Sequence, residues 1–153
     1  MPSGERVGTV VLTGAGPAFC GGFDLKGLAD EDRAETFADA AWYHRCVHAF
    51  PKVLVAAVKG AALVGKLDLA AMRDIRFADT SARFVQPYVR LGIPVAYEPL
   101  RTVVADPAAR EMCLTGQIVD ADEAVKIGLV PRIASAGHLV DDAITVARAG
   151  VPA

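Results

Sequence analysis

Two short apolar runs, each followed at once by a glycine turn, constrain the fold of this chain more than any other feature. Residues 7–12 run into the turn 13–17, and residues 53–58 are ended by Gly60. Continuous apolar runs of this length, rich in β-branched residues, are typical of strands buried on both faces of a parallel sheet. Helical spacing follows the second run, so we expect an α/β fold with a layered core.

A long helix is predicted over residues 34–50, because small and apolar residues recur there at intervals of three and four. It should stop before Pro51. We expect apolar residues such as Ala41, Trp42 and Cys46 to form its buried side, and His44 and His48 to lie on its polar side.

The rest of the chain predicts further elements in alternating order. Asp120 should cap the helix over 121–127, and Gly128 should close it. We expect one domain over residues 1–153. The other predictions are a short helix from Leu25, helices over 65–72, 98–104, 107–114 and 136–149, strands over 73–77, 82–85 and 129–133, and a loop around 92–94.

The length of the chain indicates one domain, and its charge argues against a nucleic-acid partner. At 153 residues the chain suits one domain, which buries roughly 70% of the surface of its unfolded chain. Sixteen Lys and Arg against eighteen Asp and Glu give a net charge of −2, without a basic run that would follow a phosphate backbone. We therefore expect no nucleic-acid partner.

The cysteines and the hydropathy pattern indicate a cytoplasmic protein. Cys20, Cys46 and Cys113 are an odd number without a CxxC pair, so neither a disulfide framework nor a zinc knuckle is suggested. No apolar run approaches the ~20 residues of a membrane span, and no signal peptide is recognisable. We expect no membrane partner and a cytoplasmic location.

Three other motifs have weak support. Gly14 and Gly16 follow a strand as in a dinucleotide-binding turn, but Phe19 occupies the third glycine position. His44 and His48 have the spacing of a metal pair, yet no third ligand accompanies them, so we expect a solvated pair and no metal. No nucleophile-elbow sequence is present.

Three stretches together resemble the crotonase (enoyl-CoA hydratase/isomerase) family: residues 10–26, residues 55–63, and the pair 114–116 and 128–130. Residues 74–78 and 84–87 fill the gap as the family pattern does. The resemblance implies the crotonase-like ββα-repeat fold and an acyl-CoA thioester substrate of fatty acid metabolism. The CoA is then part of the substrate, and no separate cofactor is expected.

Matching motif to motif, the resemblance places an oxyanion hole at the backbone N–H groups of Phe23 and Gly65. Gly65 opens a predicted helix, whose first amides lack partners and point at an anion. The alternative is that the glycines only make tight turns. The substrate-binding positions implied by the family are Gly22, Asp24, Lys26 and Leu63, with Lys26 facing the CoA phosphates.

The two glutamates of the family's hydratases correspond here to Asp68 and Tyr88, which are our candidate catalytic residues. Tyrosine, with a pKa near ~10, is a poor base at neutral pH. The sequence therefore favours isomerase-like proton transfer by Asp68 over two-glutamate hydration. Glu98 is an alternative base, or else a solvated residue. The family has three consecutive glycines where this chain has Val64, Gly65 and Lys66, so two side chains are added beside the expected oxyanion hole.

From the resemblance we expect segments that the family carries at both ends to be absent from these 153 residues. They are a strand pair before residue 7 and the helices after residues 136–149. In the family those helices build a trimer, so a trimer of this chain would have to form without them. We therefore expect a partial acyl-CoA-binding domain. The alternative is a catalytically silent acyl-CoA binder or a truncated remnant.

Overall fold

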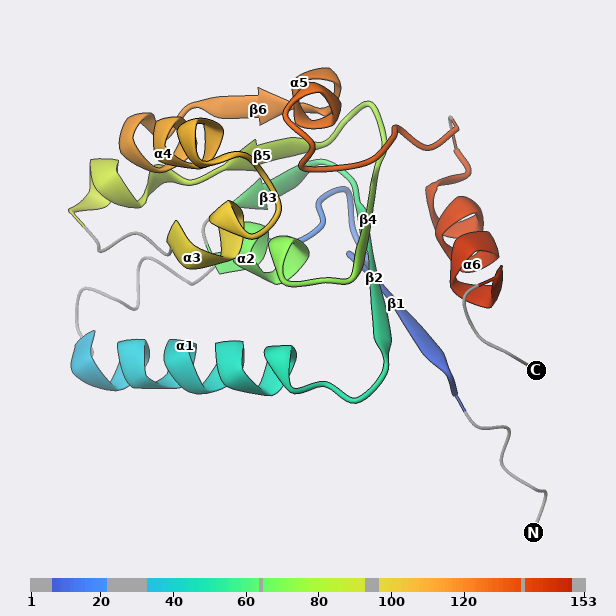
Figure 1. Cartoon of the computed structure of the whole chain (residues 1–153), viewed down its shortest axis with the longest axis horizontal. Coiled ribbons are helices and arrows are strands. Elements are labelled where there is room, and N and C mark those ends of the chain that lie inside the picture. The colour runs from blue at the N-terminus through green and yellow to red at the C-terminus, as the bar shows by residue number, and fades with distance from the viewer. Residues whose placement is uncertain (1–6, 22–32, 64, 93–96, 136, 150–153) are drawn as a thin grey trace, which may run out of the picture.

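Strands and helices alternate along the chain, which confirms the α/β class (Figure 1). The structure is a computed structural model that describes residues 7–21, 33–63, 65–92, 97–135 and 137–149. The elements are β1 (Thr9–Thr13), α1 (Arg33–His48), β2 (Val53–Val58), β3 (Ala61–Leu63), α2 (Gly65–Ala71), β4 (Ile75–Ala78), β5 (Arg83–Val85), the 3₁₀ helix η2 (Pro87–Leu91), α3 (Tyr97–Arg101), α4 (Asp106–Thr115), β6 (Ile118–Asp120), α5 (Ala121–Lys126) and α6 (Leu139–Ala149).

The first sheet is parallel and has the strand order β1-β2-β4. Val55 and Ala57 of the central strand pack in the cluster that α6 covers, whereas Ala56 and Val58 belong to the main core that includes α2. Figure 1 shows α6 on one side of this sheet and α2 and α3 on the other. Burial on both faces explains the uninterrupted apolar run of β2.

The second sheet has the order β3-β5-β6, with β3 and β5 parallel and β5 and β6 antiparallel. Phe84 of β5 is fully buried and shares the main core with Met112 of α4 and Leu129. Neither β3 nor β6 was among the predicted strands. Each has only three residues, too few to show a strand period in the sequence.

The predicted strand over 129–133 is wrong. The N–H groups of Leu129 and Val130 donate to the carbonyl of Ala124, at 2.8 and 3.2 Å, and thereby close the end of α5. Pro131 has no N–H to donate. Only Ile133 forms a bridge, to Ala78, so the apolar residues of this segment fill the core without forming a ladder.

Other predicted boundaries need smaller corrections. The helix expected over 98–104 ends at Arg101, and the last helix begins at Leu139 instead of residue 136. Asp120 caps α5 as predicted, because its Oδ1 atom accepts the N–H of Glu123 at 2.9 Å. The helix expected from Leu25 lies outside the described residues. No helix in the described ranges is both long and apolar enough to cross a bilayer.

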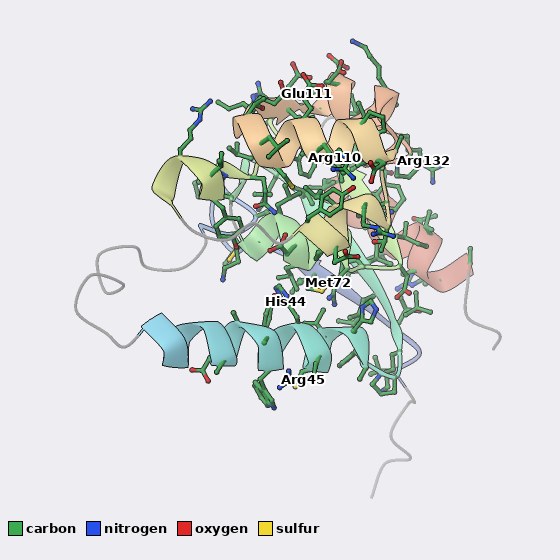
Figure 2. All side chains as sticks on the ribbon, turned by 60° about the vertical axis from the view of Figure 1, so that its left-hand side comes forward. His44, Arg45, Met72, Arg110, Glu111 and Arg132 are labelled. Atoms are coloured by element: carbon green, nitrogen blue, oxygen red, sulfur yellow. The ribbon has the colours of Figure 1, made fainter. Side chains whose placement is uncertain are left out.

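α1 has nearly the predicted length but a different buried face. Over residues 38–48 the half-buried positions are Ala40, Tyr43, His44 and Val47, whereas Trp42 is 63% exposed. Ala41 and Cys46, expected inside, are also exposed. Figure 2 shows His44 on the side of α1 that faces Met72 and Arg45 on the opposite side. The predicted orientation of this helix was therefore wrong.

The turn between β2 and β3 holds the loop that follows β1. Phe19 donates its N–H to the carbonyl of Lys59 at 2.7 Å, and Gly60 has a φ of +54°. A Cβ atom on Gly60 would lie 2.3 Å from the carbonyl oxygen of Pro17. Glycine is thus required here both by its backbone angle and by the close approach of the loop.

Gly60→Ala is expected to lower the free energy of unfolding by about 3 kcal/mol, because left-handed strain and a backbone clash add together. The matched control is Gly92→Ala, since Gly92 has a φ of +64° but open space around its Cβ position. That variant should lose only about 1 kcal/mol. Urea unfolding of both variants measures the difference, and equal losses would contradict the role of the Pro17 contact.

Candidate active site

Asp68 is a fully buried carboxylate on α2. Its Oδ1 atom accepts a hydrogen bond from Nε2 of Gln86 at 2.8 Å. Its Oδ2 atom lies 3.5 Å from the Tyr88 hydroxyl, a long hydrogen bond. The structure thus brings together Asp68 and Tyr88, the two candidate catalytic residues, and adds Gln86 as a second hydrogen-bond partner of Asp68.

The parallel pairing of β3 and β5 explains this convergence. Leu63 is in register with Val85, so the segments that follow both strands leave the same edge of the sheet. α2 carries Asp68 from one strand end, and η2 carries Tyr88 from the other. Loops and helix starts at the carboxyl ends of parallel strands are common places for functional groups.

Burial raises the pKa of Asp68 from its ordinary value of 3.8 to about 7, while the hydrogen bonds from Gln86 and Tyr88 act in the opposite direction. Burial, together with the charge of Asp68, also raises the pKa of Tyr88. Asp68 therefore exchanges its proton near neutral pH, whereas Tyr88 stays a neutral hydrogen-bond partner. A carboxyl with such a pKa suits both uptake and release of a proton.

A cavity of about 360 Å³ lies between α1 and the start of α2. Its wall includes Gly65, the first residue of α2, and Lys66. The first N–H groups of a helix lack acceptors within the helix. The α1 residues of the wall are Asp39, Ala40, Trp42, Tyr43 and His44.

His44 belongs to this site, although its sequence context suggested a solvated residue. Its Nε2 atom lies 3.9 Å from Oδ2 of Asp68, and burial lowers its pKa. His48 is exposed, so the two histidines do not form the pair that their spacing suggested. In the described ranges, no group of three or more His, Cys, Asp or Glu residues is arranged to hold a metal ion.

The remaining predicted site residues divide into three groups. Gly22, Phe23, Asp24 and Lys26 lie outside the described residues. Leu63 ends β3 half-buried, and the cavity wall does not include it. Glu98 is exposed on α3 and pairs with Arg101 at 3.4 Å, so the proposed additional base is not in the site.

Comparisons with known proteins identify the family of this chain. The family model for enoyl-CoA hydratase/isomerase matches residues 3–151. A putative enoyl-CoA hydratase of Thermus thermophilus is 37% identical over 150 residues, covering 92% of this chain and 59% of that protein. A probable enoyl-CoA hydratase of Mycobacterium bovis is 37% identical over 149 residues, covering 94% of this chain and 56% of its own length.

Solved structures support the same assignment. DspI of Pseudomonas aeruginosa superposes with a TM-score of 0.85 at 31% identity, over 93% of this chain and 61% of that one. An enoyl-CoA hydratase of Bacillus anthracis gives a TM-score of 0.84 at 31% identity, over 92% and 57%. The described core therefore has the crotonase fold, and the chain belongs to the enoyl-CoA hydratase/isomerase family.

Proposed function

We propose that this chain binds an acyl-CoA thioester and moves a proton at the carbon next to its carbonyl. One observation carries the proposal: Asp68 is fully buried, has a pKa of about 7, and follows Gly65 by one helical turn beside a cavity of about 360 Å³. A buried carboxyl with this pKa is suited to general acid and base chemistry near neutral pH.

In the proposed reaction the thioester oxygen accepts hydrogen bonds from the N–H groups of Gly65 and Phe23. The Cα–H bond breaks, its electron pair forms the enolate, and Asp68 receives the proton. The two N–H groups stabilise the enolate oxygen, and one such donor typically contributes about 3 kcal/mol. Return of the proton at another carbon completes an isomerisation, and no cofactor beyond the CoA of the substrate is needed.

Hydration is the less favoured reaction for this site. It needs a second carboxylate to activate water, and the second position holds Tyr88, whose pKa is raised above its ordinary value. The two curated relatives are called hydratases, but the chain spans only 56–59% of their length. We therefore propose proton transfer within acyl-CoA metabolism, and not the whole activity of those relatives.

Exchange of α-protons in D₂O tests the proposal. Wild-type protein should exchange deuterium into a short saturated acyl-CoA, detected by mass spectrometry, and the same compound should raise its melting temperature. Ligand at about a hundred times its Kd stabilises a protein by roughly 3 kcal/mol. Exchange no faster than in buffer would contradict the proposed chemistry.

The second candidate is a catalytically silent acyl-CoA binder, favoured by the change of a hydratase glutamate to Tyr88. It predicts the same shift in melting temperature without any exchange. Absence of both the shift and the exchange would remove both functions.

A further inference from the structure

His44 lies between the cavity and the buried carboxylate. Its ring lines the cavity with Gly65 and Lys66, and its Nε2 atom lies 3.9 Å from Oδ2 of Asp68. The His44 side chain is 29% exposed, whereas that of Asp68 is fully buried. Among the described residues of the cavity wall, His44 is therefore placed to connect this space with Asp68.

Asp68 is not part of the cavity wall. A base must come within hydrogen-bond reach of the proton it takes, or act through an intermediate group. A neutral imidazole is such a group, because one ring nitrogen accepts a proton while the other gives one up. The position of His44 matches this requirement.

We propose that His44 relays protons between the cavity and Asp68, an inference that rests on the function proposed above. The substrate Cα–H bond breaks and its electron pair forms the enolate. The proton passes to one ring nitrogen of His44, while the proton on Nε2 passes to Oδ2 of Asp68. The imidazole remains neutral, the carboxylate becomes a carboxylic acid, and reversal of both transfers returns the proton to the substrate.

The distances and the surroundings permit this relay. A side-chain movement of about 1 Å brings Nε2 and Oδ2 to hydrogen-bond distance, and such contacts commonly tighten when substrate binds. Burial lowers the pKa of His44 and raises that of Asp68 to about 7, so at neutral pH a neutral imidazole faces a carboxyl that can take up a proton. Among the described residues, the other titratable groups around the pair are Tyr43 and Asp39 on α1, Lys66 on α2, Tyr88 on η2, Cys113 on α4, and Arg73 and Cys20 near Tyr43.

The test is His44→Ala with and without added imidazole. We expect the variant to exchange α-protons about 100-fold more slowly than wild type. Free imidazole should raise that rate at least about tenfold and in proportion to its neutral form, which a purely structural role of His44 does not predict. His48→Ala is the matched control, because His48 is exposed one turn further along α1. It should keep the wild-type rate without any response to imidazole.

A second measurement follows the pair without substrate. NMR titration of the imidazole nitrogens should show a step in the His44 chemical shifts as Asp68 ionises near its pKa of about 7, and Asp68→Asn should abolish this step while the His48 shifts stay as in wild type. This result holds for the pair even if the chain catalyses nothing.

The outcomes separate the two proposals. Wild-type exchange with an unaffected His44→Ala variant, or a slow variant that imidazole does not restore, overturns the relay and leaves the proposed function standing. Absence of wild-type exchange overturns the proposed function and the relay step with it. In that case, a titration in which His44 responds to Asp68→Asn supports only the contact between His44 and Asp68. A His44 titration that ignores Asp68→Asn overturns the pair itself.

Discussion

Asp68→Asn is expected to slow α-proton exchange by about 10²–10⁴-fold, because it removes the group that takes up the proton. Asparagine keeps the size of the side chain and an oxygen that can accept the hydrogen bond from Gln86. Binding of the acyl-CoA should therefore change little, and the loss should appear in kcat and not in KM. Deuterium incorporation and the shift in melting temperature measure the two effects separately.

Glu98→Gln is the matched control for this variant. It also neutralises a carboxylate, but Glu98 is exposed on α3 and paired with Arg101. Its exchange rate should stay within about twofold of wild type, since exposed ion pairs contribute little. An Asp68→Asn rate that equals the control would show that Asp68 is not the proton acceptor, and a loss in the control would return Glu98 to the site.

Some elements of this fold could be predicted from the sequence because burial or local contacts determine their pattern directly. β2 is covered on both faces and therefore reads as one apolar run, and the cap at Asp120 depends only on residues close to it in sequence. β3 and β6 could not be predicted, since three residues carry no period. The segment 129–133 looked like a strand because it is buried, but its first N–H groups close α5.

The site was only partly predictable for a related reason. The family pattern points to Asp68 and Tyr88, and the structure shows how the register of β3 and β5 brings them together. His44 was missed because apolar residues are spread around α1, so its pattern does not fix which side turns inward. On the inward side of α1, Tyr43 and His44 lie near polar groups such as Asp68. Helical spacing alone does not encode such contacts with residues distant in the sequence.

The buried carboxyl should also make the folded protein lose stability as the pH rises, and Asp68→Asn should abolish that loss. In the unfolded chain Asp68 ionises near its ordinary pKa of 3.8, whereas in the folded protein its pKa is about 7. Below both values the group is protonated in both states and contributes no penalty. Between them only the unfolded state releases its proton, so stability falls until the pH passes the folded pKa.

The size of this effect follows from the pKa difference. Each pKa unit corresponds to about 1.4 kcal/mol, so Asp68 should cost about 4 kcal/mol of stability between roughly pH 4 and pH 7. Urea unfolding of wild type and Asp68→Asn across this range measures it as a gap that widens with pH. Glu98→Gln should show no widening gap, because Glu98 is exposed. A pH-independent difference between wild type and Asp68→Asn would mean that Asp68 ionises normally, and the proposed proton uptake near neutral pH would lose its basis.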